Sequence, residues 1–312
     1  MTLMIDVLII GGGAAAMSAA IYTARKKLNT QIVTDEVGGQ TALQPEIYNY
    51  AGFLDKDGHQ LMQNMRTQVS ELGVPIVEST GGVKKVSVRE EDGKEVFIVT
   101  DNAGKTHEAK SIIIASGKKP RTMGVPGEEK FSNKGVTYCA TCDAPLFSGK
   151  TVVVVGGGNS GLDAAMQLTK YATKVYVFES NEKVKGDQIT QDKLAESSMV
   201  EIWTNIEVKE VKGEKFVSSI VYKNKTTGEE KELAVEGVFV TIGMLPNSDF
   251  LKDICDLNQW GEVMINPKTN ATSHVGIFAA GDITDVLEKQ TVIAAGEGAK
   301  AALQCYKWLQ SR

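Results

Sequence analysis

The sequence predicts an α/β protein made of two doubly wound modules, the second inserted into the first. Its length of 312 residues suits two such modules better than a single hydrophobic core. Residues 7–16 are echoed by residues 152–161, and each copy is typical of an aliphatic strand that runs into a glycine turn. Two segments rich in Gly and Pro, 117–126 and 243–247, indicate crossings between the modules.

The first module begins with a βαβ pattern. A buried strand over 3–10 leads through the glycine turn to an Ala-rich helix over 17–26 and a second strand over 31–34. Polar turns then separate three strand-like runs, which predict a β-meander at 83–88, 96–100 and 111–115. The second module repeats the βαβ order, with elements expected at 152–155, 162–170 and 174–179.

The chain is expected to return to the first module after the second crossing. A strand over 275–280 is followed by a closing helix over 291–310, where Ala and Leu recur at helical spacing. The predicted domains are therefore 1–117 with 246–312, and 118–245. Both have the pattern of a Rossmann-like, three-layer dinucleotide-binding domain.

Composition and charge exclude several classes of protein. The formal net charge is -5, and Lys and Arg are scattered, so there is no basic stripe of the kind that binds nucleic acid. No apolar run approaches the roughly 18 residues that span a bilayer, and the first apolar stretch lacks the basic segment of a signal peptide. We therefore expect a cytoplasmic protein with no nucleic-acid and no membrane partner.

The glycine turns are candidate nucleotide sites. A turn that touches a pyrophosphate has no room for side chains, which accounts for Gly11 and Gly13, and for the small Ala16 where helix meets strand. The second copy has Gly156 and Gly158 in the same places. The alternative is a tight turn without a ligand, but two copies in one chain favour a flavin and a nicotinamide that are bound together.

Glu179 favours NADH over NADPH at the second turn. It ends the next strand about 20 residues after Gly158, where a carboxylate can hydrogen-bond both ribose hydroxyls and repel a 2′-phosphate. No Arg follows it directly, although Lys183 and Lys185 could partly compensate, so NADPH stays open. The alternative is an exposed acid at the end of a strand.

Cys139 and Cys142 form a Cys-x-x-Cys pair, whereas Cys255 and Cys305 stand alone. Two cysteines at this spacing at the start of a helix can close a small disulfide ring. Half of a zinc site is the alternative, but zinc would need two further Cys or His ligands at short spacings, so we expect a redox pair and no metal. Asp143 can deliver a proton during thiol exchange, or it can simply cap the helix.

Together these motifs resemble the low-molecular-weight thioredoxin reductases and the similar flavoprotein subunit of bacterial alkyl hydroperoxide reductase. The resemblance covers essentially the whole chain. It rests on Gly11-Gly-Gly, Gly38-Gly-Gln, Cys139-Ala-Thr-Cys-Asp, Gly156-Gly-Gly-Asn-Ser-Gly, Ile242-Gly-Met-Leu-Pro-Asn and Gly276-Ile-Phe-Ala-Ala-Gly-Asp. The second module is more similar to the peroxide-reductase branch, at Val184-Lys-Gly-Asp-Gln, Gln191-Asp-Lys-Leu and Gly296-Glu-Gly-Ala-Lys, and it lacks an Arg-rich NADPH segment after Phe178.

One departure from the family concerns the partner. The peroxide-reductase flavoprotein has an extra thioredoxin-like domain ahead of its flavin module, whereas this sequence begins at the expected flavin strand. We therefore expect the electron acceptor to be a separate protein, a thioredoxin or a glutaredoxin-like protein. The resemblance also implies a homodimer.

The resemblance implies that FAD lies in the first module. The acid of the first βαβ unit is Asp35 or Glu36, and the spacing does not decide between them; Asp35 is kept as the site residue. Asp282 would bind the ribityl chain, and Gln290 with Thr291 would meet the flavin ring. The other expected flavin residues are Gly11, Gly13, Ala14, Ala15, Gly39, Gln40, Asn49, Val83, Ser116, Gly117 and Gly281.

The resemblance also implies roles in the second module. The pyridine nucleotide would be bound by Gly156, Gly158, Asn159, Ser160, Glu179 and Gly243. Cys142 would face the flavin, Cys139 would attack the substrate disulfide, and Asp143 would be the acid. One sulfur must meet the flavin and the other a bulky protein, so the family rotates the nucleotide domain about the two crossings.

Two alternatives to an NADH-dependent reductase stay open at this point. One is a reductase of the same fold that is fed by another donor, such as NADPH or ferredoxin. The other is a non-catalytic flavin-binding protein that acts by binding a partner.

Overall fold

The protein is described by a computed structural model, which covers residues 4–44, 47 and 49–312 apart from the side chains of Thr141 and Cys142. The chain forms two compact units, Met1–Lys119 with Leu245–Arg312, and Pro120–Met244. The predicted α/β architecture with an inserted second module is confirmed.

The first unit is built on one seven-stranded sheet with the order β3-β2-β1-β6-β5-β4, in which β17 also pairs with β6. Strands β1, β2, β3, β6 and β17 run parallel, whereas β4 and β5 form the antiparallel meander that the sequence predicts. The strands are β1 Ile5–Ile10, β2 Thr30–Thr34, β3 Ile76–Glu78, β4 Val83–Glu91, β5 Lys94–Asp101, β6 Thr106–Ile114 and β17 Ile277–Ala279.

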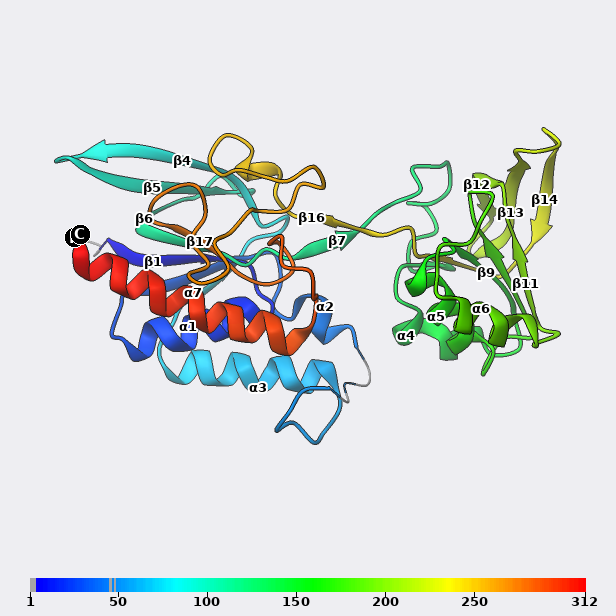
Figure 1. Ribbon diagram of the computed structural model, residues 1–312, viewed down its shortest axis with the longest axis horizontal. Helices are drawn as coiled ribbons and strands as arrows, with labels where there is room; N and C mark the ends of the chain where they lie inside the picture. Colours follow the sequence, from blue (N-terminus) through cyan, green and yellow to red (C-terminus); the bar gives the residue numbers. More distant parts are fainter. Residues whose placement is uncertain (1–3, 45–46, 48) are drawn as a thin grey trace. The chain divides into compact units, whose positions relative to one another are not determined.

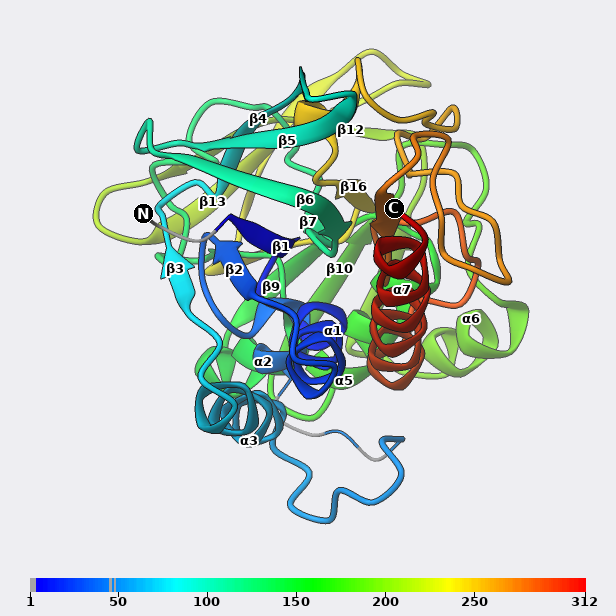
Figure 2. The ribbon, with the colours of Figure 1, turned by 90° about the vertical axis from the view of Figure 1, so that its left-hand side faces the viewer.

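Helices α1, α3 and α7 lie together on one face of this sheet (Figures 1 and 2). Val7 and Ile9 of β1 pack toward these helices, while Leu8 and Ile10 face the other side, so β1 is buried on both faces. The helical segments of this unit are α1 Ala14–Arg25, α2 Gly39–Ala42, α3 Gly58–Glu71, the 3-10 turn η2 Asp249–Leu251 and α7 Thr291–Ser311. Helix α1 begins earlier than predicted, because it starts directly after Gly13.

The second unit has a parallel five-stranded sheet with the order β11-β10-β9-β15-β8. Its strands are β8 Val136–Thr137, β9 Thr151–Val155, β10 Lys174–Phe178, β11 Val200–Trp203 and β15 Gly237–Val240. Its helical segments are α4 Ala140–Asp143, the 3-10 turn η1 Ala144–Phe147, α5 Asn159–Leu168 and α6 Gln188–Ala195. In β9, Val152 and Val154 pack with the helices, whereas Val153 and Val155 pack on the opposite face.

A three-stranded antiparallel sheet covers that opposite face and completes the layers of the second unit. It consists of β12 Ile206–Gly213, β13 Val217–Asn224 and β14 Glu230–Ala234, none of which the motifs predict. Phe178 stacks on Trp203 with ring centroids 5.5 Å apart, and Tyr222 of β13 packs against both rings. The aromatic cluster therefore joins β10 and β11 to the added sheet.

The two crossings are more regular than their sequences indicate. Strand β7, Lys118–Pro120, pairs with β16, Met244–Pro246, in a two-stranded sheet. Strands of three residues are too short to show a periodicity in the sequence, so only the Gly and Pro content of these segments could be recognised.

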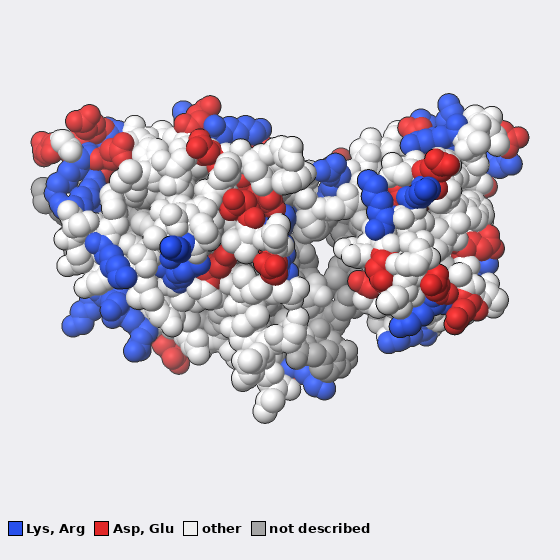
Figure 3. All heavy atoms as spheres, viewed as in Figure 1, with Lys and Arg blue, Asp and Glu red and all other residues white. Residues whose placement is uncertain are grey.

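Acidic and basic side chains are interspersed on the face of each unit that Figure 3 shows. Many act in local pairs, such as Arg66–Glu78 at 2.8 Å and Lys212–Glu232 at 2.9 Å. Exposed pairs of this kind contribute little to stability. Within the described ranges, no helix is both long enough and apolar enough to cross a bilayer.

Candidate active site

A cavity of about 980 Å³ lies in the first unit, at the carboxyl ends of its parallel strands. Segments from both ends of the chain form its wall. The cavity is lined by every residue that the sequence assigned to the flavin, namely Gly11, Gly13, Ala14, Ala15, Asp35, Gly39, Gln40, Asn49, Val83, Ser116, Gly117, Gly281, Asp282, Gln290 and Thr291.

The glycine turn at the start of α1 has two separate structural reasons. Gly11 has φ +122, and a Cβ there would lie 2.1 Å from the carbonyl oxygen of Ala115, so this glycine allows β1 and β6 to approach each other. A Cβ on Gly13 would meet open space. No side chain among the described residues caps α1, so its first N–H groups are available to a ligand in the cavity.

The sequence-distant residues of the cavity contact one another. The Asn49 side-chain amide donates to Gln290 Oε1 at 2.9 Å, and the hydroxyls of Thr41 and Thr291 lie 3.1 Å apart. Asp35 and Glu36 both line the cavity, and Asp35 accepts the N–H of Gly81 at 2.7 Å. The structure therefore places both acids at the cavity.

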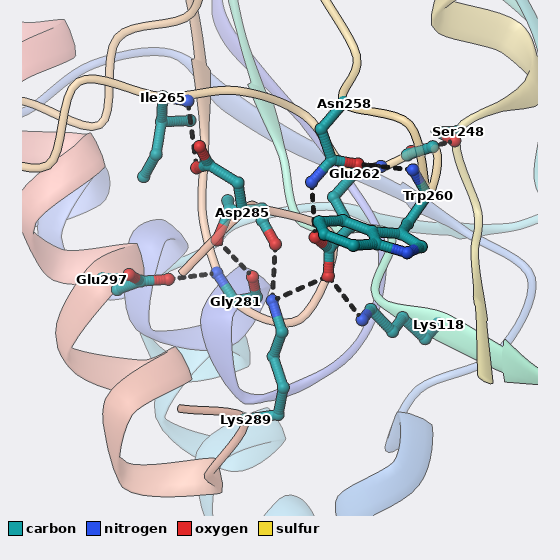
Figure 4. A network of polar contacts seen from close by, with 12 residues as sticks. Lys118, Ser248, Asn258, Trp260, Glu262, Ile265, Gly281, Asp285, Lys289 and Glu297 are labelled. Carbon is teal, nitrogen blue, oxygen red and sulfur yellow. Dashed lines mark hydrogen bonds and ion pairs between the residues drawn. The ribbon is translucent and has the colours of Figure 1, made fainter. Parts of the chain in front are cut away.

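Charged residues missed by the motifs line one side of the cavity. Lys118 and Lys289 converge on Glu262 at 2.7 and 3.4 Å, as Figure 4 shows. Burial would raise the pKa of Glu262, but hydrogen bonds from Lys118 and Asn258 keep it below its ordinary value. The two lysines are thus fixed in place beside a carboxylate. Lys118 lies in a segment that the sequence identified only as a crossing.

Two further carboxyl groups lie near Lys289, the half-buried Asp282 and the buried Glu297. Burial raises the pKa of Asp282, and the nearby charges of Lys289 and Lys118 only partly offset this effect. Burial also raises the pKa of Glu297, whose carboxylate accepts the N–H of Gly281 at 2.7 Å (Figure 4). The turn that carries Asp282 is therefore connected to α7 through Glu297.

The second glycine turn joins β9 to α5. Gly158 precedes the first turn of α5, and a Cβ on it would meet open space. Gly156 has φ +117, and a Cβ on it would lie 2.6 Å from the carbonyl oxygen of Thr241. Asn159 and Ser160 are exposed at the start of the helix, and Asn159 Oδ1 accepts the N–H of Asp187 at 2.8 Å.

Two further expected nucleotide residues lie in this unit. Gly243 comes just before β16, and its carbonyl accepts the N–H of Arg121 at 2.9 Å. Glu179 directly follows β10 and is only 6% exposed.

The Glu179 carboxylate is already engaged in the second unit. It accepts hydrogen bonds from the Gly157 N–H at 2.9 Å and from the N–H and side-chain amide of Asn181 at 2.8 and 2.6 Å. Burial would raise the pKa of Glu179, but these bonds and the charge of Lys185 hold it below its ordinary value. A carboxylate has about four acceptor positions, so roughly one remains for a ligand hydroxyl.

The thiol motif follows β8: Cys139 directly precedes α4, and Cys142 belongs to that helix. Cys139 is disulfide-bonded, and the side chain of Cys142, its predicted partner, lies outside the described residues. Cys255 and Cys305 are free and buried, and burial raises the pKa of the Cys305 thiol to about 12. Asp143 ends α4, and its N–H donates to the Cys139 carbonyl at 3.2 Å.

Thr137 is a polar contact of the thiol motif that sequence reasoning missed. Its hydroxyl donates to Asp143 and accepts the Cys139 N–H at 3.2 Å. The sequence feature that could have identified it is a hydroxyl side chain two positions before the first cysteine, from which it can bond to the nearby backbone.

Known proteins match this chain over nearly its whole length. Residues 5–298 match the family described as pyridine nucleotide-disulphide oxidoreductase. An alkyl hydroperoxide reductase subunit of Staphylococcus aureus (strain MRSA252) is 42% identical over 304 residues, which are 97% of this chain and 59% of that protein. The chain therefore spans about three fifths of the length of this relative.

Solved structures of similar proteins cover nearly the whole chain. Thioredoxin reductase from Lactococcus lactis is 32% identical, with a TM-score of 0.82 over 99% of this chain and 100% of that one. Thioredoxin reductase from T. acidophilum is 36% identical, with a TM-score of 0.78 over 97% of this chain and 98% of that one.

Proposed function

The chain belongs to the pyridine nucleotide-disulphide oxidoreductase family, and on that premise we propose that it is a flavin-dependent reductase of protein disulfides. NADH would supply the electrons, bound FAD would carry them to the Cys139–Cys142 pair, and a thioredoxin- or glutaredoxin-like protein would receive them. The disulfide of Cys139 is the observation that carries the proposal. Exchange with the disulfide of another protein needs a cysteine that can itself form and release a disulfide bond.

The cavity of the first unit supports FAD as the cofactor. Its volume of about 980 Å³ is at the large end of the usual range for small-molecule sites. The free N–H groups at the start of α1 would bind the pyrophosphate, and Asp282 would bind hydroxyls of the ribityl chain. Bound there, the flavin would supply the two-electron chemistry that links a reduced nicotinamide to a disulfide.

Glu179 supports NADH as the electron donor. Hydrogen bonds hold the pKa of Glu179 below its ordinary value, so the side chain carries a negative charge at neutral pH. A 2′-phosphate near the end of β10 would meet this charge as a like charge. Lys185 lowers the same pKa and offsets part of the repulsion.

The comparisons support a thioredoxin-fold protein as the acceptor. Two solved structures that match nearly the whole chain are thioredoxin reductases. The 42% identical relative is instead part of an alkyl hydroperoxide reductase, so a peroxide-reducing system is a source of acceptors to include in any test.

The test is a turnover assay with NADH and NADPH against purified thioredoxin-fold proteins of the same organism. We expect NADH to support reduction of at least one acceptor with a higher kcat/KM than NADPH. Cys142→Ser should abolish acceptor reduction, whereas Cys255→Ser is the matched control, because Cys255 is free and buried. Acceptor reduction that survives Cys142→Ser would refute the proposal.

A further inference from the structure

Thr137 connects both chemical groups of the thiol motif to the sheet of the second unit. It is the last residue of β8, where it pairs with Phe239 of β15, and it is only 6% exposed. Its Oγ1 accepts the N–H of Cys139 at 3.2 Å and donates to Oδ2 of Asp143. One buried hydroxyl thus contacts the backbone of the cysteine and the carboxyl group of the acid.

The directions of these two hydrogen bonds are fixed by chemistry. A backbone N–H can only donate, so Thr137 Oγ1 accepts from Cys139 and has its single proton free for Asp143. Asp143 lies four residues after Cys139, and the bond from its N–H to the Cys139 carbonyl closes one helical turn. Residues with this spacing lie on the same helical face, so the hydroxyl holds the carboxyl group on the side of the cysteine.

We propose that Thr137 is a positioning residue that holds Asp143 in place to protonate the sulfur that leaves when Cys139 attacks a disulfide. This inference rests on the proposed function, which assigns Cys139 as the attacking thiol and Asp143 as the acid. Neither the sheet position of Thr137 nor its burial alone requires a hydroxyl there, since valine has the same shape and suits a buried strand as well.

The step balances in atoms and electrons. The Cys139 thiol gives its proton to the Asp143 carboxylate and attacks as a thiolate. A sulfur–sulfur bond forms between Cys139 and one half of the substrate disulfide, and the original sulfur–sulfur bond breaks. The other half leaves with the electron pair and takes the proton from Asp143, so the substrate gains one thiol and one mixed disulfide remains.

The test compares Thr137→Val, which removes the hydroxyl and keeps the shape, with Thr137→Ser, which keeps the hydroxyl. The 312-residue chain is reduced with dithiothreitol, desalted without oxygen and mixed with one of two small disulfides. Hydroxyethyl disulfide releases an alkyl thiol that needs a proton, whereas 5,5′-dithiobis(2-nitrobenzoic acid) releases a stable thiolate. Burial raises the pKa of both Cys255 and Cys305, so these two cysteines form little thiolate and react slowly. The fast phase of thiol release from the small disulfide therefore reports on Cys139 and Cys142.

We expect Thr137→Val to slow the reaction with hydroxyethyl disulfide about tenfold and the other reaction much less, because a positioned acid contributes on the order of a hundredfold or more. Thr137→Ser should react within about twofold of the unchanged chain. In an Asp143→Asn chain, adding Thr137→Val should have little further effect, since both changes remove the same contribution. Thr137→Ala provides the same comparison if the valine variant does not fold.

Three outcomes would overturn the proposal: equal slowing with both disulfides, no rescue by serine, or the full effect of valine in the Asp143→Asn chain. These readouts need no flavin reduction, pyridine nucleotide or partner protein. A chain that fails to turn over with NADH and any thioredoxin-fold acceptor would therefore refute the proposed function without deciding the role of Thr137.

Discussion

Glu179 is a buried carboxylate directly after β10, and hydrogen bonds hold its pKa below the ordinary value. Its place after a Val-rich strand and a glycine turn predicts a nucleotide-proximal acid. The structure adds that the carboxylate is buried and accepts bonds from Gly157 and Asn181. Spacing could not predict these partners, because the bond to Gly157 depends on how the turn packs against β10. Its contribution to specificity is therefore expected to come more from its charge than from free acceptor positions.

Glu179→Gln tests this contribution, because it removes the charge and keeps the shape. Two like unit charges 4 Å apart repel each other by roughly 1 kcal/mol in bulk water and by roughly 4 kcal/mol near a protein surface. We expect the ratio of kcat/KM for NADH to that for NADPH to fall about tenfold. Glu182→Gln, at an exposed neighbouring position, is the matched control and should leave the ratio unchanged. Steady-state kinetics with both nucleotides measures the effect, and an unchanged ratio in Glu179→Gln would remove Glu179 as a specificity residue.

Helix α7 has a periodicity that the sequence shows and a packing contact with α1 that it does not. Ala and Leu at helical spacing predict the helix, and it spans Thr291–Ser311. Its packing is set by Gly298, where a Cβ would lie 2.1 Å from the carbonyl oxygen of Ala15 in α1. Gly296 lies in the same helix, and a Cβ there would meet open space. Only the folded neighbours of these two glycines distinguish them.

Gly298→Ala and Gly296→Ala form a matched pair. We expect Gly298→Ala to lower the free energy of unfolding by about 1 to 3 kcal/mol, because overpacking displaces α7 from α1, and to weaken FAD binding, because Ala15 lines the cavity. Gly296→Ala should stabilise the chain by about 1 kcal/mol through helix propensity. Urea unfolding and FAD titration measure both effects, and equal stability of the two variants would contradict this account of the packing.

Two elements that the motifs missed had different signals. Helix α3 has Asp57 as an N-cap, and Leu61, Met65 and Val69 recur four residues apart, so its pattern was present in the sequence. In the sheet β12–β14, strand β14 has no buried residue and so no apolar alternation to mark it in the sequence. The register of this sheet depends on contacts made after folding. Turn motifs therefore identify the strands and helices of the candidate nucleotide sites more readily than the layers that cover them.

At the scale of the whole molecule, the two candidate nucleotide sites lie in different units. The cavity with Gly13 and Asp282 belongs to the first unit, and the turn at Gly158 belongs to the second. The residues that the family motifs assigned to FAD line this cavity, including the distant pair Asn49 and Gln290. The motifs did not predict that these two side chains are hydrogen-bonded, since sequence separation carries no information on such contacts.

Hydrogen exchange tests this assignment of the two sites in the 312-residue chain. A ligand that binds the folded state slows exchange where it stabilises local structure. We expect FAD, added to flavin-free chain, to protect peptides that span 10–16 and 280–291 and to leave 155–162 unchanged. NAD⁺ should protect 155–162 instead. Protection of 155–162 by FAD would contradict the assignment of the two sites.

A count of thiols tests the central claim most directly. The oxidised, FAD-loaded chain is mixed with NADH without oxygen, quenched in denaturant and titrated for thiols. Cys255 and Cys305 are free before the reaction, and we predict that NADH adds about two thiols per chain from the reduced disulfide, with no gain in Cys142→Ser. Bleaching of the flavin with no new thiols would contradict electron transfer through Cys139 and Cys142.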